Sequence, residues 1–360
     1  MDDLKNWLIL NRIPGFGSRK ILQLLTHVEE PAQIVNAPGG QLKQWGFSAK
    51  AIDFLGHDPE QALVDDLDWL GDDKHIVTFE QPQYPSLLRE ITDPPLLLYV
   101  QGNVSVLNSP QLAIVGSRNP TAQGKNNAEE FASALSQSGM VVTSGMALGI
   151  DAAAHEGALK SHQPTIAIMG TGLDRVYPAR HRDLAHRISE QGALVSEFAI
   201  GTGVKPGHFP KRNRIISGLS LGVLVVEAAI KSGSLITAKL AMDQGREVFA
   251  IPGSIHNPLA RGCHLLIRDG AKLVETANDV VEELSAMALF NTKKVEGKQS
   301  SENNHKNSAS LSKTGTHLAG NLDNEQQAIL DVIDFSTTPV DVIVERSRLS
   351  VEVVSGTLLI

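Results

Sequence analysis

The spacing of hydrophobic residues differs between two parts of the chain. Residues 1–70 carry apolar positions spaced as on short amphipathic helices, in WLILNRI, SRKILQLLTHV and QALVDDLDWL. From residue 110 to about residue 288, short continuous apolar runs alternate with helix-like segments. Strands buried on both faces have continuous rather than alternating apolar runs, so this pattern predicts a parallel sheet covered by helices. We expect a doubly wound α/β domain here.

The remaining segments complete the predicted organisation. Residues 76–109 form an extended, proline-containing connection, and residues 291–322 are polar and rich in Ser, Asn and Lys, which predicts a flexible linker. Beyond the linker, three short apolar patterns resemble a helix-turn-helix, and the chain ends inside an apolar run. We therefore predict a helical domain over 1–72, an α/β domain over 76–288, the linker, and a partial, truncated domain over 323–360.

Composition excludes several classes of protein. The 360 residues include one cysteine, which excludes a disulfide framework and a multi-cysteine metal site. The N-terminus lacks the features of a signal peptide, and no apolar run reaches the ~20 residues of a membrane span. We expect a soluble, cytoplasmic protein without a membrane span.

Positive charge is concentrated in the middle of the chain. The formal net charge is −8, and residues 1–75 hold 7 basic and 12 acidic side chains. Residues 110–275 instead hold 17 basic and 13 acidic side chains. A local positive field of this kind can attract an anionic ligand despite the overall negative charge.

Four loops that follow predicted strands are rich in Gly and Ser. They begin at Gly116, Ser144, Gly170 and Lys231, and two of them contain an adjacent cation. In an open parallel sheet, ligands bind at the carboxyl ends of the strands, where Gly lets backbone N–H groups approach anionic oxygens. A single Gly-rich loop could be explained by the need for a tight turn alone. Four such loops with hydroxyls and cations favour a phosphate-binding site along this edge, or rim, of the sheet.

The segment 205–214 is the most basic on the chain. It contains four cations and the aromatic Phe209, with no acidic residue. Lys and Arg supply phosphate contacts, and an aromatic ring among them can stack on a base. A solvated helix end is the alternative interpretation of such a charge run. Because the segment precedes a strand of the same sheet, we favour a nucleic-acid site.

Familiar catalytic motifs are incomplete. A P-loop fails at Asn119, a dinucleotide fingerprint fails at Arg175, and a zinc-protease motif fails at Leu159. Ser220 lies in a Gly-x-Ser-x-Gly pattern that precedes a strand instead of following one. We predict no catalytic residue, metal or cofactor.

Three titratable residues remain at the predicted rim of the sheet. These are Asp151, His155 and Asp174, for which capping or helix-dipole roles are the default.

The N-terminal segment Pro14 to Lys20 suits a helix-hairpin-helix. Its glycine N–H groups and basic side chains could contact a DNA backbone without reading sequence. The same hairpin also serves as a packing or protein-contact element, and both interpretations stay open.

Six segments in order resemble the DprA family, also called Smf, of DNA-processing proteins in bacterial transformation. They are YPSLLREITDPPLLLYVQGN, VGSRNPT, SGMALGIDAAAH, GTGLDRVYP, FPKRNRIISGLS and SGSLITAKLAMDQGREVFAIPG, and the resemblance is strong over about 80–288. It implies an extended Rossmann-like core, an N-terminal SAM-like domain and a C-terminal winged-helix domain. It also implies a non-enzymatic dimer that binds single-stranded DNA in a basic pocket and loads RecA during natural transformation. Double-stranded DNA and single-strand-binding protein are further partners that the resemblance leaves open.

The resemblance carries site residues over from three motifs. The first loop would hold a phosphate through Gly116, Ser117 and Arg118. The basic wall would consist of Lys205, Phe209, Lys211, Arg212, Asn213 and Arg214. The last turn would close the pocket with Ser232, Gly233, Ser234 and Thr237, with Lys231 and Lys239 nearby.

A nucleotide-binding enzyme is the alternative. The phosphate rim also resembles phosphoribohydrolases related to lysine-decarboxylase-like proteins, which need a catalytic Glu after a Gly-rich turn. Here Ala238 and Lys239 follow the turn, and Glu227 lies before it. We therefore favour the DNA-binding mediator.

Overall fold

A computed structural model describes residues 2–285, 329 and 340–357, which fall into two compact units. The first lies within Met1–Lys294 and the second within Val295–Ile360. The predicted linker over 291–322 lies outside the described residues. No helix in the described part of the chain combines the length and apolar character needed to cross a membrane.

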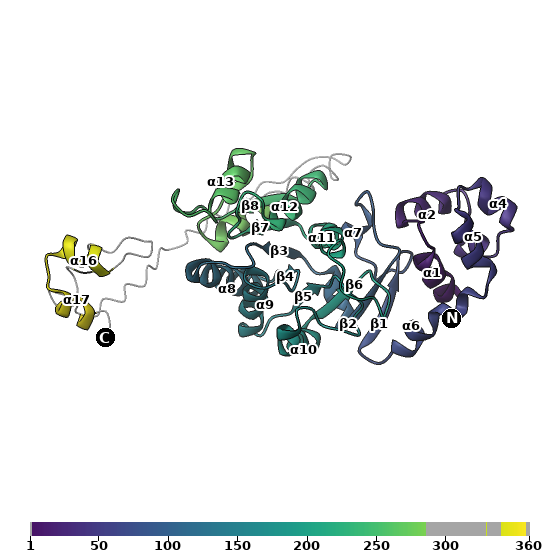
Figure 1. Ribbon diagram of the computed structural model, residues 1–360, viewed down its shortest axis with the longest axis horizontal. Helices are drawn as coiled ribbons and strands as arrows, with labels where there is room; N and C mark the ends of the chain where they lie inside the picture. The colour runs from purple at the N-terminus through teal and green to yellow at the C-terminus, as the bar shows by residue number, and fades with distance from the viewer. Residues whose placement is uncertain (1, 286–328, 330–339, 358–360) are drawn as a thin grey trace, which may run out of the picture. The chain divides into compact units, whose positions relative to one another are not determined.

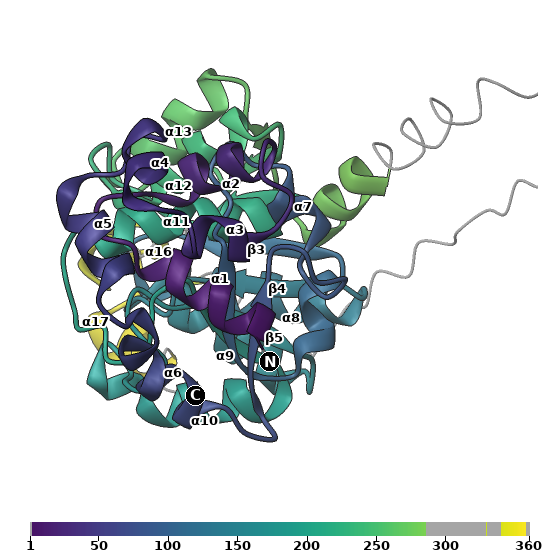
Figure 2. The same cartoon turned by 90° about the vertical axis from the view of Figure 1, so that its right-hand side faces the viewer.

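Short helices form the N-terminal part of the first unit (Figures 1 and 2). They are α1 (Asp2–Arg12), α2 (Ser18–Leu25), α3 (Pro31–Val35), α4 (Gly39–Gln44), α5 (Ala49–Gly56), η1 (Pro59–Leu63) and α6 (Val64–Trp69). Local sequence sets several boundaries: Pro31 occupies the first turn of α3, and the Ser48 hydroxyl caps α5 by accepting from the Ala51 N–H. The apolar positions predicted from the sequence, such as Trp7, Leu10 and Ile21, are buried in their core.

A nine-stranded sheet follows, in the order β1-β2-β6-β5-β4-β3-β7-β8-β9. Its strands are β1 (Lys74–Thr78), β2 (Leu97–Gly102), β3 (Gln111–Val115), β4 (Val141–Ser144), β5 (Thr165–Ile168), β6 (Ala193–Ser196), β7 (Gly222–Val225), β8 (Glu247–Ala250) and β9 (Lys272–Leu273). β1 and β2 are antiparallel, whereas the pairs from β6 to β9 are parallel. The continuous apolar runs predicted from residue 110 onward thus correspond to the seven parallel strands, β3 to β9. The predicted connection over 76–109 contributes β2 and most of β1, which pair with each other in antiparallel orientation.

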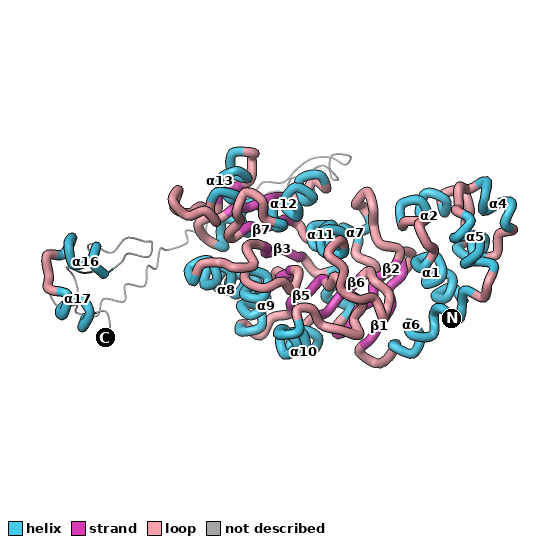
Figure 3. The backbone as a smooth tube through the Cα atoms, viewed as in Figure 1, coloured by secondary structure: helices cyan, strands magenta, loops and turns pink. Residues whose placement is uncertain are grey.

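Helices cover both faces of the sheet (Figure 3). Along β3, Ala113 and Val115 face α11 (His208–Leu219), α12 (Gly233–Asp243) and α13 (Arg261–Arg268). Leu112 and Ile114 face the other side, which α8 (Ala122–Gln137) and α9 (Ile150–Lys160) cover. The N-terminal helices and α10 (Arg182–Gln191) share a further apolar cluster with Leu97 and Tyr99 of β2. Both sheet faces are therefore buried, as the continuous apolar runs predict.

The strand order creates a crevice beside β3. From β3 the chain proceeds through β4, β5 and β6 on one side, and then returns to β7 on the other side. The connections after β3 and β7 therefore leave the sheet on opposite faces, and ligands in such folds bind at this divergence.

The second unit is small in its described part. It contains α16 (Val340–Ser347) and α17 (Val351–Thr357), with Ile329, Ile343 and Val354 buried together. These helices agree with two of the three apolar patterns found after the predicted linker.

Candidate nucleic-acid interface

A pocket of about 630 Å³ lies at the crevice beside β3. We call it the core pocket. Its lining comes from five segments of the chain and comprises Val115, Gly116, Arg118, Ala147, Asp151, Tyr177, Val204, Pro206, Phe209, Pro210, Arg212, Asn213, Ile216, Ser232, Gly233, Ser234, Ile236 and Thr237. Nine of the fifteen residues predicted as a DNA site line it, so the loops after β3 and β7 meet as the strand order requires.

The helix α12 begins at the core pocket. The hydroxyl of Ser232 accepts a hydrogen bond from the Ser234 N–H and caps the helix. Ser232, Gly233 and Ser234 all line the pocket. A helix N-terminus carries partial positive charge and unpaired N–H groups, so this wall suits a phosphate.

The helix α11 supplies the opposite wall through one of its faces. Phe209, Arg212, Asn213 and Ile216 follow a spacing of three, four and seven residues, which places them on one side of a helix. All four line the core pocket. Because of this helical spacing, only part of the basic segment 205–214 faces the pocket.

Arg212 fixes a positive charge in the pocket wall. Its side chain is buried, and its Nη1 donates to the carbonyl oxygens of Gly145 and Ile168. Burial lowers the pKa of the guanidinium to about 10, although the nearby Asp151 carboxylate opposes this shift. A Cβ at residue 145 would lie 2.4 Å from the guanidinium, so only Gly145 allows this approach. Arg212 therefore remains charged at neutral pH.

An aromatic pair stands at the mouth of the pocket. The rings of Tyr177 and Phe209 have centroids 5.5 Å apart and are tilted by 40°. Phe209 reaches this position because Gly170 has no side chain: a Cβ there would lie 2.9 Å from the Phe209 ring. Sequence reasoning found Phe209 but missed Tyr177, which is 46 % exposed. The signal available was its place in GTGLDRVYP, in the loop after β5.

Asp151, His155 and Asp174 do not gather at the rim. Asp151 lines the pocket and accepts a hydrogen bond from the Ala147 N–H, while burial raises the pKa of its carboxyl. The placement of His155 at the rim is wrong. This residue of α9 is fully buried, its Nδ1 lies 2.8 Å from the Thr165 hydroxyl, and burial lowers its pKa to about 3.

Asp174 has structural partners beside the pocket. It pairs with Arg175 and accepts from the Gly201 N–H. Among the residues that the structure describes, no three His, Cys, Asp or Glu side chains cluster as a metal site would require.

Lys211 and Arg214 lie on another face of α11, where they meet carboxylates. Arg214 is buried and makes two hydrogen bonds to Glu197, of 3.1 and 2.7 Å, and one of 3.3 Å to Asp93. Lys211 forms an ion pair of 3.0 Å with the same Glu197. We call these four residues the α11 seam. The predicted basic wall is thus divided between the core pocket and the seam.

The other predicted residues surround the pocket without lining it. Lys205, Lys231 and Lys239 are exposed next to lining residues. Ser117 shapes the loop after β3: its N–H donates to the Glu227 carbonyl, and its hydroxyl accepts from the Asn119 N–H.

The N-terminal hairpin contacts the core through the seam. The Ser18 hydroxyl donates to the Asp93 carboxylate over 2.6 Å. Burial alone would raise the pKa of Asp93, but this hydrogen bond and Arg214 outweigh burial and lower it. At Ser18 the hairpin is therefore a packing element, and the carboxylate makes this side of the hairpin unfavourable for a DNA phosphate.

Comparison with known proteins decides the family. The sequence profile described as DNA recombination-mediator protein A matches residues 75–285. The chain belongs to this family. A second profile, the DprA winged helix domain, matches residues 316–360. The C-terminal part is therefore a DprA winged-helix domain, in agreement with the predicted fold class.

Members of the DprA family from several bacteria are similar to the chain. Protein Smf of Escherichia coli is 41 % identical over 286 residues, which cover 79 % of this chain and 76 % of that protein. DNA processing protein DprA of Streptococcus pneumoniae is 48 % identical over 200 residues, covering 56 % of this chain and 71 % of the relative.

Two solved DprA structures share the fold. The X-ray structure of DprA from Streptococcus pneumoniae has a TM-score of 0.68 at 37 % identity and covers 77 % of this chain and 97 % of its own. DprA from Helicobacter pylori, whose structure was described for its single-stranded DNA binding mode, has a TM-score of 0.53 at 30 % identity. That match covers 59 % of this chain and 96 % of the Helicobacter chain.

Proposed function

We propose that this DNA recombination mediator binds single-stranded DNA in the core pocket, acts as a dimer and loads RecA onto the bound strand during natural transformation. The observation on which this proposal depends is the convergence of Arg118, the buried Arg212, the N-terminus of α12 and the Tyr177–Phe209 pair on one pocket.

The pocket matches the two chemical parts of a single strand. Within the described part of the chain, the exposed Arg118 forms no ion pair, although the Asp151 carboxylate lies within electrostatic range, so its guanidinium is available for a phosphate oxygen. The exposed ring of Tyr177 and the ring of Phe209 offer stacking surfaces to unpaired bases. A duplex keeps its bases stacked inside, and therefore gains only the phosphate contacts. This difference supports a preference for single strands with little dependence on sequence.

We propose further that the protein acts without catalysis. The carboxylate of Glu227 accepts from the hydroxyl and the N–H of Thr121, over 2.7 and 2.9 Å, and so binds the N-terminus of α8. Asp151 is held by the Ala147 N–H. These structural roles support a binding function over the phosphoribohydrolase alternative.

Dimer formation and RecA loading rest on family membership. Light scattering of the purified protein should give twice the chain mass. If the protein loads RecA, it should shorten the lag before RecA filaments assemble on single strands coated with single-strand-binding protein. Duplex DNA serves as the control. The cytoplasmic location stays a prediction.

Fluorescence anisotropy of a labelled single-stranded oligonucleotide tests the proposal. We expect binding that resists a duplex competitor and weakens steeply as salt rises, because phosphate contacts release counterions. Equal competition by duplex and single strand, or no binding at low salt, would contradict it.

A further inference from the structure

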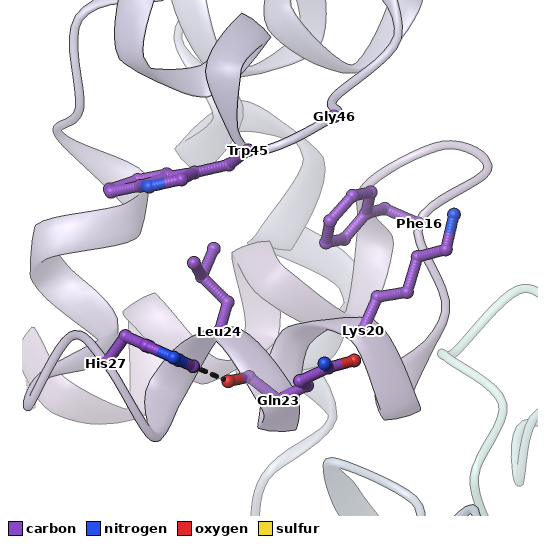
Figure 4. A pocket seen from close by; sticks show the side chains of 7 residues that line it. All are labelled: Phe16, Lys20, Gln23, Leu24, His27, Trp45 and Gly46. Carbon is purple, nitrogen blue, oxygen red and sulfur yellow. Dashed lines mark hydrogen bonds between the residues drawn. The ribbon is translucent and has the colours of Figure 1, made fainter.

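A second pocket, of about 480 Å³, opens among the N-terminal helices (Figure 4). We call it the N-terminal groove. Its lining residues are Phe16, Lys20, Gln23, Leu24, His27, Trp45 and Gly46. The hairpin and α2 contribute four of them, His27 follows α2, and Trp45 and Gly46 follow α4. None of these residues belongs to the core pocket.

The aromatic side chains of the groove leave one ring available. Phe16 is stacked on Phe47, with centroids 3.9 Å apart, and the Lys20 ammonium lies 5.5 Å from the Phe16 centroid. The indole of Trp45 faces Leu24 and His27 across the opening (Figure 4). Among the described residues, no aromatic ring stacks on Trp45. The indole packs partly against the N-terminal apolar cluster, and its exposed part beside the open space is a stacking surface for a planar group.

Charge is separated within the N-terminal helices. The two segments that form the groove, 13–28 and 37–52, contain Arg19, Lys20, Lys43 and Lys50 and no Asp or Glu. The segment 53–73 contains eight acidic residues and no Lys or Arg. Of these cations Lys20 lines the groove itself, and no carboxylate among the described residues does, so the groove suits an anionic ligand on a region whose total charge is negative.

The groove adjoins a smaller pocket that reaches the α11 seam. Phe16 also lines this pocket of about 250 Å³, which Lys211 and Glu197 of the seam share. The helix that carries Lys211 presents its other face to the core pocket. A strand that leaves the core pocket over α11 would pass Lys211 before it reached Phe16 and the groove.

We propose that the N-terminal groove is a second contact site for single-stranded DNA. A base stacks on Trp45, while Lys20 and Arg19 bind the phosphates beside it. The inference rests on the proposed function, since the same strand occupies the core pocket. DNA fits this groove better than an acidic peptide does because the smaller pocket links the groove to α11, the helix that also lines the core pocket.

Oligonucleotide length separates the two sites. In the full chain, Trp45→Ala should weaken binding of a strand of about thirty nucleotides by about tenfold, the loss of one base stack, and leave a strand of about six nucleotides unaffected. Trp45→Phe keeps a stacking ring and should retain most of the affinity. Lys20→Ala should weaken binding of the long strand and lower its salt dependence. Lys125→Ala, which removes an equal charge from α8, is the matched control.

Tryptophan fluorescence gives a readout that a structural role would not change. The chain has three tryptophans, and Trp7 and Trp69 are buried. Quenching by the long strand therefore reports on Trp45, and we expect this quenching to disappear in Trp45→Phe. Thermal unfolding of each variant checks that the fold is retained.

The outcomes distinguish this inference from the proposed function. If Trp45→Ala binds both lengths as the wild type does and DNA causes no quenching, the groove is not a DNA site, whereas a loss of binding in Arg118→Ala leaves the core pocket standing. If an acidic peptide quenches Trp45 and DNA does not, the groove binds a protein and the inference is overturned. If the wild type binds neither strand, the proposed function fails first and the inference fails with it.

Discussion

The segment 205–214 supplies Arg212 to the core pocket and Lys211 and Arg214 to the α11 seam, and the two regions use these cations in opposite ways. In the pocket, Arg212 is bound by carbonyl oxygens, and Arg118 of the facing loop has no carboxylate partner among the described residues. In the seam, Arg214 and Lys211 are both paired with Glu197. Phosphate must displace a bonded carboxylate in the seam but not at Arg118. The comparison shows that a basic run on a helix divides into faces, and that the face whose cations form no ion pair can supply the stronger anion site.

Removing Arg214 should have the largest effect, and the effect should be on stability. Its loss leaves the buried Glu197 with one partner, which costs about 3–5 kcal/mol in unfolding free energy for a buried pair. Urea unfolding of Arg214→Ala measures this cost. The folded fraction should bind a short single strand normally. A stable variant with weak binding would instead place Arg214 in the DNA site.

Removing the Phe209 ring should affect binding. Base stacking on an aromatic side chain contributes about 1–3 kcal/mol, so Phe209→Ala should weaken binding of single strands about fivefold to a hundredfold. Phe209→Tyr keeps the ring and serves as the control. Anisotropy titrations measure both, and equal affinities of the two variants would remove stacking from the account.

Acid should destabilise the buried His155 and the α11 seam over different pH ranges. The pKa of His155 is lowered by burial from 6.5 to about 3, so the unfolded state binds a proton that the folded state does not. Stability should fall by about 1.4 kcal/mol per pH unit as the pH drops below 6.5. The pKa of Asp93 in the seam is lowered from 3.8, so its contribution is lost only in more acidic solution.

Urea unfolding of the wild type and His155→Gln between pH 7 and 4.5 tests this assignment. The variant should lack most of the pH dependence in that range. An unchanged slope in the variant would assign the acid sensitivity to other groups.

Sequence alone predicted the sheet and most of the pocket, for physical reasons. Continuous apolar runs mark buried parallel strands, and the loops after β3 and β7 must meet at the edge where the strand order reverses. The pairing of Arg214 could not be predicted in this way, because Asp93 lies 121 residues away and Glu197 is on the segment after another strand. Tyr177 was missed because its contact with Phe209 depends on the fold of the loop after β5.

The placement of His155 at the rim failed for a related reason. Sequence position alone does not show which side of α9 its ring occupies, and the structure turns it towards Thr165 in the interior. The strands β1 and β2 were also missed, because the pairing of β2 with β6 joins segments far apart in the sequence.

The salt dependence of binding to a strand of about six nucleotides tests the central claim most directly. It compares the wild type with Arg118→Ala and Lys211→Ala, which remove one positive charge each from the core pocket and the α11 seam. We predict that Arg118→Ala weakens binding about tenfold and reduces the slope of log K against log salt by about 0.7, the value for one phosphate contact on a single strand. Lys211→Ala should retain the wild-type affinity and slope. Equal losses in the two variants, or a loss confined to Lys211→Ala, would contradict the assignment of single-stranded DNA to the core pocket.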